Sequence, residues 1–439
     1  MPPGLTFVGD RATRWEIGLT ALLFAVITLA AALQQEAQWW PLLEGDAFQY
    51  FDMTRQFDAG QTTVRATGPF VYRIAVPWVA SFATWPQIDE YLPFLILNIT
   101  SAFAVAMLLL VWLRRFVASP FVRVLMVAVF LFAWHGPARF TYFYPVYVDP
   151  PFMVAVMAAL ILLDSRETTA IRTTALVLVV FIGTLVRESM LLVAVAAMAA
   201  PGPLHAGAPW RTVARRLAPM AAAGAALAFT RSVGVLSAPY SPFSEPLAML
   251  ERKPVFTWVL GWFFTFGPPV VALIVANGRR FMEICRGRPH VALFFAGCLV
   301  ASYVGGTDTE RIAAWAAPVV YAAAGRSIER FATALGHVPL VVVLTVAQAV
   351  SARIFWPVPS MSYNVEPYAW SGGGVERIYE AFNRLVVIHT HYTYLWSYFG
   401  SRAWHAALLV YDAAFVGAIV VWIWMRDRRR VPAVMANSS

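Results

Sequence analysis

Acidic and arginine side chains recur in the polar segments that separate the long apolar stretches of this 439-residue chain. A carboxylate can accept a proton from a hydroxyl group or bind a divalent cation, and an arginine can bind a phosphate through paired hydrogen bonds. Because charges beside long apolar stretches are costly, they point to a functional site. The charged candidates are Asp46, Asp149, Arg187, Glu188, Asp308 and Arg311.

The pattern of residues 44–53 predicts a short amphipathic helix that begins at the first candidate, Asp46. The apolar face of this helix includes Ala47 and Tyr50. Asp46 and Asp52 are six positions apart, about 240° around a helix, so both cannot easily point into one site. Asp46 is the better candidate, although aspartate is also a preferred helix cap and that role stays open.

Each of the other candidates also has a purely structural alternative. Asp149 precedes two prolines at a predicted helix start, where an aspartate can serve as a cap. Arg187 and Glu188 could compensate each other's charge. Asp308 and Arg311, at positions i and i+3, could do the same.

Other kinds of chemistry find less support in the sequence. His389 and His391 resemble a metal-binding pair, but no carboxylate stands at ligand spacing beside them. Two cysteines, Cys285 and Cys298, imply neither a disulfide framework nor a cysteine metal site. Because no Walker loop, dinucleotide fingerprint or nucleophile elbow stands in a credible context, ATP-driven chemistry is unsupported.

The elements that position the charged candidates are predicted to be membrane helices. Hydrophobic residues make up 60% of the chain and charged residues only 13%, whereas a soluble domain carries about 25% charged residues. Several windows reach the roughly 17 to 25 apolar residues that cross a bilayer. The first, residues 17–33, is longer than the apolar core of a cleavable signal peptide, so we expect a retained helix.

The chain is therefore expected to be an all-α polytopic membrane protein with about twelve transmembrane helices. Clusters such as Arg114 and Arg115 lie just beyond apolar segments, where the positive-inside rule expects cytoplasmic ends. This orientation places both termini in the cytoplasm and explains the net charge of +9 without nucleic-acid binding. The expected spans are residues 17–33, 91–113, 120–135, 146–163, 174–186, 189–200, 217–236, 255–276, 290–304, 312–325, 338–355 and 403–424.

Two of the polar tips between spans are expected to lie below the outer membrane surface. Residues 174–200 are apolar except at Arg187 and Glu188, and charge bias favours a hairpin there over one long helix. Each arm of about 13 residues reaches only ~20 Å, less than the hydrocarbon thickness of about 30 Å. Residues 305–311 predict a second such tip, and polar backbone at this depth requires a protein-lined or wet cavity.

Two long extracytoplasmic loops, residues 34–90 and 356–402, are expected to carry helices that lie on the membrane surface. The first such helix is predicted over residues 70–85 and the second over residues 375–386. Tryptophans anchor the first loop at the interface. The expected regions are a transmembrane core over residues 1–236 and a C-terminal transmembrane region over residues 237–439.

This arrangement resembles the GT-C superfamily of polytopic glycosyltransferases. A first helix is followed by a long outer loop with an acidic residue near its start, in the string GDAFQY at residues 45–50. A second acidic residue, Asp149, follows in the next outer loop. The strings VYRIAVP at residues 71–77 and LVRES at residues 185–189 are also similar to bacterial members. The similarity covers roughly residues 15–200.

The resemblance implies transfer of a sugar from a polyprenyl-phosphate donor to a glycan, lipid or protein acceptor at the extracytoplasmic face of a bacterial cytoplasmic membrane. Asp46 would accept a proton from the acceptor or hold a divalent cation such as Mg²⁺ or Mn²⁺, with Asp149 as second ligand or acceptor guide. Arg187 and Arg311 would bind the lipid phosphate. The residues expected to complete the substrate and phosphate site are Tyr50, Arg73, Glu188 and Asp308.

A secondary transporter or lipid flippase is the alternative, because twelve helices with both termini inside also suit that class. The two short hairpins favour transport, whereas the concentration of acidic residues in outer loops favours the enzyme. A transferase of acyl or phosphoglycerol groups is a third hypothesis, weakened by the lack of a convincing catalytic histidine within the membrane.

Overall fold

The computed structural model of the protein describes residues 11–34, 46–83, 91–133, 135–165, 169–200, 210–334, 336–352, 397–398 and 402–436. Helices form almost all of the regular structure in these ranges. In the first half of the chain they are α1 (Arg11–Gln34), α3 (Asp46–Asp58), α4 (Ala75–Ser81), α5 (Leu92–Leu113), α6 (Pro120–Phe132), α7 (Pro137–Phe143), α8 (Asp149–Leu163), α9 (Ala170–Val186), α10 (Leu191–Met198) and α11 (Trp210–Val233). In the second half they are α12 (Ser244–Arg252), α13 (Val255–Phe266), α14 (Pro268–Ala276), α15 (Gly278–Gly287), α16 (Pro289–Val304), α17 (Thr309–Ala313), α18 (Ala317–Glu329), α19 (Val338–Ser351) and α21 (Arg402–Ala436).

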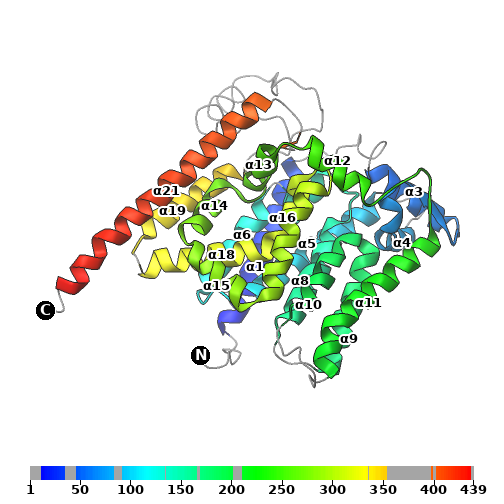
Figure 1. Cartoon of the computed structure of the whole chain (residues 1–439), viewed down its shortest axis with the longest axis horizontal. Coiled ribbons are helices and arrows are strands. Elements are labelled where there is room, and N and C mark those ends of the chain that lie inside the picture. The colour runs from blue at the N-terminus through cyan, green and yellow to red at the C-terminus, as the bar shows by residue number, and fades with distance from the viewer. Residues whose placement is uncertain are drawn as a thin grey trace.

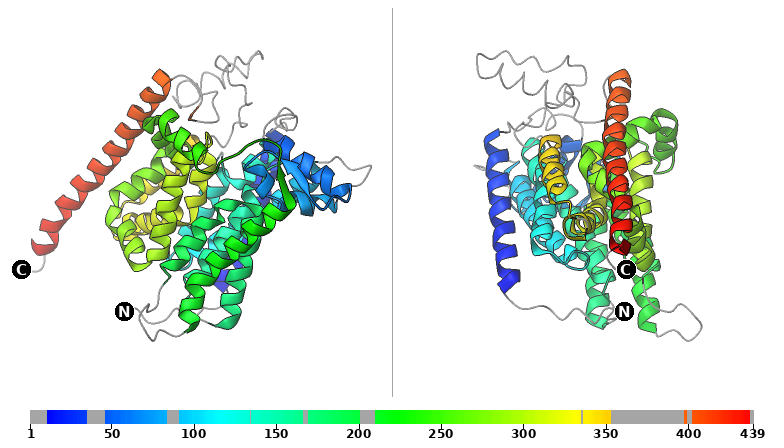
Figure 2. Two further views of the ribbon diagram at one scale, coloured as in Figure 1. Left: turned by 45° about the vertical axis from the view of Figure 1, so that its right-hand side comes forward. Right: turned by 90° about the vertical axis from the view of Figure 1, so that its left-hand side faces the viewer.

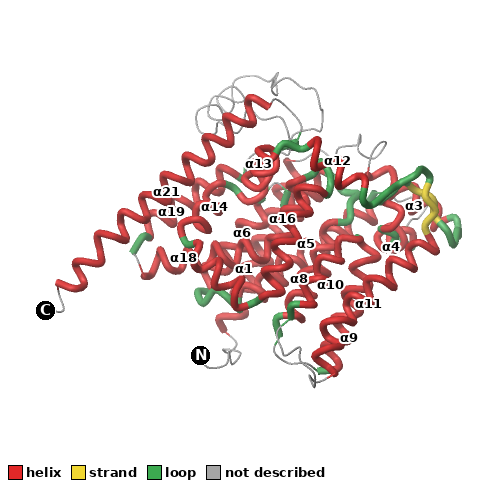
Figure 3. The backbone as a smooth tube through the Cα atoms, in the orientation of Figure 1, coloured by secondary structure: helices red, strands yellow, loops and turns green. Residues whose placement is uncertain are grey.

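Short turns and one small sheet complete the described structure. Strand β1 (Val64–Ala66) pairs in parallel with β2 (Gly234–Leu236), and both lie beside α3 (Figure 3). The short helical turns are η1 (Phe70–Tyr72), η2 (Glu188–Met190), η3 (Ala314–Ala316) and the π-helical η4 (Arg330–Ala334).

Four of the described helices are long and apolar enough to cross a membrane, or six spans if each of two bent pairs counts as one. This confirms the predicted all-α membrane protein but not the predicted number of about twelve spans. The 15 residues of α8 reach only about 22 Å at 1.5 Å per residue, so they are too short to cross the hydrocarbon core. The candidate spans are Arg14–Leu33, Leu92–Leu113, Pro120–Phe143 and His405–Met425, and the bent pairs are Val255–Phe266 with Pro268–Ala276 (98°) and Gly278–Gly287 with Pro289–Val304 (116°).

The bend between α13 and α14 follows from the local sequence. Gly267 has a φ of 79°, a conformation that favours glycine. The two prolines that follow start α14, because they lack the N–H that a continuous helix would need. The side chain of Gln348 on α19 fills the space beside Gly267 and donates a hydrogen bond to the carbonyl oxygen of Phe266 at 2.8 Å. The contact with α19 thus stabilises the bend between α13 and α14.

The helices pack as one bundle with α8 near its middle. Helix α8 packs against α5 and α9, while α14 packs against α18 and α21. Helices α1 and α21 stand on the outside of the bundle (Figure 2). Helices α3 and α4 and the two strands lie at the opposite end of the bundle from the N-terminus (Figure 1), and we call this the α3 end.

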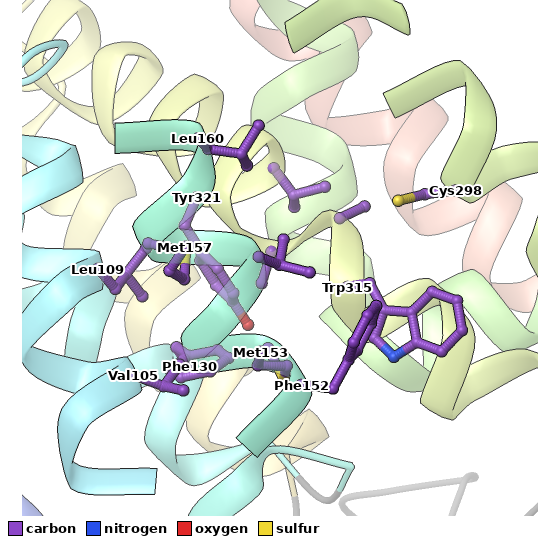
Figure 4. Close-up of a cluster of buried hydrophobic side chains, with 14 of the residues drawn as sticks. Val105, Leu109, Phe130, Phe152, Met153, Met157, Leu160, Cys298, Trp315 and Tyr321 are labelled. Atoms are coloured by element: carbon purple, nitrogen blue, oxygen red, sulfur yellow. The ribbon is translucent and has the colours of Figure 1, made fainter. Parts of the chain in front are cut away.

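A large apolar core is shared by helices from both halves of the chain. Figure 4 shows part of it, where side chains of α5, α6, α8, α16 and α18 meet. The rings of Phe130 and Tyr321 lie edge to face with centroids 5.7 Å apart. Phe152 of α8 packs in the same manner against Trp315 at 4.9 Å. Such aromatic pairs fix the positions of the helices, and therefore also of the residues at the helix ends.

The end of the bundle near the N-terminus is tied together by buried carboxylates. Glu16 of α1 is buried and accepts hydrogen bonds from Arg114 at 2.8 Å and from Arg123. Asp164, just past the end of α8, forms ion pairs with Arg115 at 2.9 Å and with Arg288 at 2.6 Å. The arginine clusters of the sequence therefore share one end of the bundle with these acids.

The α3 end differs in part from the sequence prediction. The expected short helix at Asp46 is confirmed as α3. The expected interfacial helix over residues 70–85 is wrong in extent, because the described residues 70–83 contain only η1 and the seven-residue α4. Pro77 lies in the first turn of α4, where its missing N–H is tolerated, so α4 begins only two residues before it. The predicted helix over residues 375–386 and the histidines at 389 and 391 lie outside the described residues.

Candidate functional site

Arg311 of α17 lies at the centre of a charged cluster at the α3 end. Its Nη1 donates to Oδ2 of Asp308 at 2.9 Å and to Oδ2 of Asp46 at 3.2 Å. Its Nη2 and Nε both donate to Oδ2 of Asp149, at 2.6 and 3.1 Å. One guanidinium thus joins its own turn to two carboxylates that are 265 and 162 positions away in the chain.

Asp149, the first residue of α8, is buried and has both oxygens occupied. Besides Arg311, it accepts from Nη1 of Arg187 at 2.7 Å and from Nε1 of Trp315 at 3.2 Å. All of these donors are side chains of other elements, so the alternative role as a helix cap is wrong. Two guanidinium groups compensate the charge of this carboxylate, which is what allows it to be buried.

Asp46, like Asp308, is a partly exposed carboxylate of this cluster. Its side chain is 30% exposed, and its only described partner is Arg311, which leaves Oδ1 without a partner among the described residues. Partial burial raises the pKa of Asp46, the charge of Asp308 raises it further, and Arg311 opposes both. A raised pKa makes the carboxylate a stronger base than an exposed aspartate.

Arg187 lies where α9 ends and the predicted break in residues 174–200 occurs. It has extended backbone angles, φ −158° and ψ 129°, between α9 and η2. Its guanidinium carbon lies 4.7 Å from the ring centre of Trp315, a cation–π contact. Its Nε is buried and has no hydrogen-bond partner among the described residues. The side chain of Arg187 is thus fixed in position, and its Nε–H group still lacks an acceptor among the described residues.

Glu188 forms its direct ion pair with Arg73, although its charge also partly compensates that of the adjacent Arg187, as one of the sequence interpretations proposed. Its two oxygens accept from Nη2 and Nε of Arg73 at 2.6 and 2.8 Å, a bidentate ion pair. Arg187 is extended and Glu188 begins the turn η2, and the two side chains form ion pairs with different partners, Asp149 and Arg73. Arg73 also donates through Nη1 to the hydroxyl of Tyr50 at 3.0 Å.

The structure therefore brings together all the residues that the sequence predicted for the site. Asp46, Asp149, Arg187, Asp308 and Arg311 form one cluster. Tyr50, Arg73 and Glu188 form a second beside it. The two clusters are joined at two points. Asp46 and Tyr50 are neighbours at positions i and i+4 of α3, and Arg187 and Glu188 share a peptide bond.

An aromatic segment before α8 positions both aspartates. The hydroxyl of Tyr144 accepts a hydrogen bond from the backbone N–H of Ala47 at 3.0 Å, which fixes the start of α3 beside it. Asn98 of α5 donates to the carbonyl oxygens of Pro145 and Tyr147 at 2.7 and 3.0 Å. This segment thereby links the starts of α3 and α8. Its aromatic composition was visible in the sequence, but these contacts were not.

The cluster does not fit a divalent cation shared by Asp46 and Asp149. The guanidinium of Arg311 bridges these two carboxylates, and both oxygens of Asp149 already accept hydrogen bonds. A cation would have to displace the guanidinium of Arg311. The two positive charges would also repel each other. Within the part of the chain that the structure describes, no group of three histidine, cysteine or acidic residues gathers at metal-binding distance.

Lys253 and Glu310 form a buried polar region on the other side of α17 that the sequence did not single out as a site. Lys253 donates through Nζ to the carbonyl oxygens of Ser302, at 3.1 Å, and Gly306, and to the hydroxyl of Thr309 at 3.1 Å. Burial lowers the pKa of Lys253 to about 8. Glu310 is fully buried and accepts from the backbone N–H of Ser397 at 2.6 Å. These contacts tie α17 to the segments on both sides of it.

Glu310→Gln should remove a pH dependence of stability. Burial raises the pKa of Glu310 from 4.5 to about 7, so the folded protein holds this proton more tightly than the unfolded chain does. The contribution to stability is then fully present below pH 4.5 and is lost as the pH rises towards 7. We expect the thermal unfolding midpoint to fall over this range in the original protein and to vary less in Glu310→Gln. Glu283→Gln, in an exposed ion pair, is the control, and an equal slope in Glu310→Gln would contradict the assignment.

Comparisons of the chain with protein-family models, with curated proteins and with solved structures find no match.

Proposed function

We propose that this chain is a membrane glycosyltransferase that moves a sugar from a polyprenyl-phosphate donor to a hydroxyl group of an acceptor, with its site at the extracytoplasmic face. The observation that carries the proposal is the convergence of Asp46, Asp149, Arg187 and Arg311 from four separate segments at one end of a helical membrane protein. The cluster combines an accessible carboxylate with buried guanidinium groups, which are the two charges that the reaction needs.

In the proposed reaction Asp46 acts as the base. The acceptor hydroxyl gives its proton to Oδ1 of Asp46, which has no partner among the described residues, and the acceptor oxygen forms a bond to the anomeric carbon of the sugar. The bond between that carbon and the phosphate oxygen breaks, and its electron pair leaves with the polyprenyl phosphate. The hydrogen bond from Arg311 to Oδ2 holds Asp46 in orientation during this transfer.

The phosphate of the leaving group is assigned to Arg187. The three nitrogens of Arg311 already donate to carboxylates, and those of Arg73 donate to Glu188 and Tyr50. Arg187 is the arginine of the cluster that has a buried N–H without a partner in the described structure. Arg311 is therefore proposed as a positioning residue for Asp46 and Asp149.

Arg187→Gln should weaken binding of polyprenyl phosphate about 10- to 100-fold, as expected for the loss of a hydrogen bond to a charged group, worth roughly 1.5–3 kcal/mol. The measurement is a titration of polyprenyl phosphate into the detergent-solubilised protein, followed by tryptophan fluorescence. Arg252→Gln, on the exposed surface of α12, controls for general attraction between the protein and the lipid charge. Equal affinities of Arg187→Gln and the original protein would reject the phosphate assignment.

The proposed activity is tested with the full chain in proteoliposomes and a radiolabelled polyprenyl-phosphate sugar. A glycosyltransferase releases polyprenyl phosphate as it transfers the sugar to an added acceptor, and both products are separated by chromatography. Movement of the intact donor across the membrane without cleavage would instead contradict the proposed enzymatic activity.

That outcome would favour the second candidate, a transporter or flippase. The specific observation in its favour is the pair of bent helices, α13 with α14 and α15 with α16, because discontinuous helices frequently form substrate sites in transporters. The first bend lies at Gly267, which is not among the residues of the charged cluster.

A further inference from the structure

A cavity of about 650 Å³ is lined by residues of α3 and of the two-stranded sheet. Its volume falls within the roughly 300–1,000 Å³ of small-molecule sites. The walls include Phe48, Gln49 and Asp52 of α3, Arg65 of β1, and Ser237, which follows β2. None of these residues takes part in the hydrogen bonds of the charged cluster.

The cavity begins close to the proposed base. Gln49 follows Asp46 by three positions, so these two residues are neighbours on the surface of α3, whereas Asp52 lies about 240° around the helix from Asp46. Gln49 is one turn, about 4.5 Å along the helix axis, from Asp46. The buried face of α3, which includes Ala47, lies on the other side. A molecule bound in the cavity can therefore extend to Asp46 along the surface of α3.

The cavity wall offers several polar groups in fixed positions. Gln56 donates to Oδ2 of Asp52 at 2.7 Å and exchanges hydrogen bonds with the backbone of Arg65 at 2.9 and 2.6 Å, which locks α3 onto β1. Oε1 of Gln49 accepts from the backbone N–H of Thr67 at 2.9 Å, which orients its amide. Within the described structure, Oδ1 of Asp52 and the NH₂ group of Gln49 keep their hydrogen-bonding capacity.

These groups match the chemistry of a hydroxyl-rich ligand. Neighbouring hydroxyls of a sugar both donate and accept, and they complement an amide, a carboxylate and a guanidinium in one wall. Phe48 is 42% exposed, and an aromatic face with its negative charge density attracts the C–H groups of a pyranose ring. Because Asp52 and Arg65 are of opposite charge, the wall favours neither strongly anionic nor cationic ligands.

We propose that this cavity binds an oligosaccharide as the acceptor, with the hydroxyl that is to be glycosylated placed at Asp46. The placement of the hydroxyl at Asp46 rests on the proposed glycosyltransferase function. Binding of the oligosaccharide in the cavity can be measured without any transfer. It narrows the acceptor to a glycan, since a lipid chain or an apolar peptide would leave the amide, carboxylate and guanidinium of the wall without hydrogen-bond partners.

The test uses the full chain in lipid nanodiscs, applied to an array of oligosaccharides of defined sugar and linkage. The best-bound oligosaccharide is then titrated against variants. Phe48→Ala and Asp52→Asn should each weaken its binding about tenfold, equal to ~1.4 kcal/mol. Asp52→Asn keeps an acceptor for Gln56, so the lock between α3 and β1 should survive. The matched controls are Phe82→Ala, an exposed aromatic after α4, and Asp58→Asn, an exposed carboxylate on α3.

The possible outcomes test the proposed glycan site and the proposed transfer reaction separately. Weaker binding in both cavity variants and unchanged binding in both controls would support the acceptor site. Binding that the cavity variants leave unchanged, or no binding of any oligosaccharide by a protein that still cleaves the donor, would overturn it. Oligosaccharide binding at the cavity without donor cleavage would overturn the transferase and keep the glycan site.

Discussion

Asp46→Asn should reduce the rate of sugar transfer about 10²- to 10⁴-fold, the usual contribution of a general base. The asparagine can still accept the hydrogen bond from Arg311, so the geometry of the cluster should be retained, but its amide cannot take up the acceptor's proton. The measurement is kcat for transfer of radiolabel from the polyprenyl-phosphate donor, together with donor affinity, which should change little.

The matched control for Asp46→Asn is Asp58→Asn, because both residues lie on α3 and only Asp46 contacts Arg311. The pH profile supplies a second test. Since partial burial and the charge of Asp308 raise the pKa of Asp46 above 3.8, the rate should fall at acidic pH with a midpoint above that value. Full activity of Asp46→Asn would remove Asp46 from the reaction.

Asp149→Asn should destabilise the folded protein by about 3–5 kcal/mol, as expected when one partner of a buried ion pair is removed. The variant leaves Arg187 buried without its ion-pair partner and removes one of the three carboxylates that pair with Arg311. Loss of the charge also weakens the link between the start of α8 and α17. The expected results are a large fall in the thermal unfolding midpoint and loss of transfer activity.

Asp308→Asn is the matched control for this effect. It removes a carboxylate from the same guanidinium, at 2.9 Å, but the side chain of Asp308 is 31% exposed. Water screens such a pair, so its loss should cost less than about 1 kcal/mol. If the two variants were equally stable, burial of Asp149 would not be the source of its contribution.

The sequence was sufficient where the deciding interactions are local. The start of α3 at Asp46 and the break at Arg187 were predicted, because a helix start and an interruption of apolar periodicity depend on nearby residues. The candidate residues were also found, since charges beside apolar segments are few and costly. Their roles in sugar transfer remain predictions.

The number of membrane spans was predicted wrongly for a physical reason. Hydropathy measures how apolar a segment is, and a short helix buried by its neighbours is as apolar as one that crosses lipid. Helix α8 is such a case, because nine of its 15 residues are buried inside the bundle. Its length of about 22 Å would have been the better guide.

Composition and local pattern alone determined that this protein is helical, belongs to a membrane and carries its acids and arginines in the segments between helices. Only the tertiary structure decided which charges pair: Arg187 with Asp149, Arg73 with Glu188, and Arg311 with three carboxylates at once. The reason is that an ion pair depends on distance in space, and neither the 115 positions between Arg73 and Glu188 nor the 162 between Asp149 and Arg311 are bridged by any local rule.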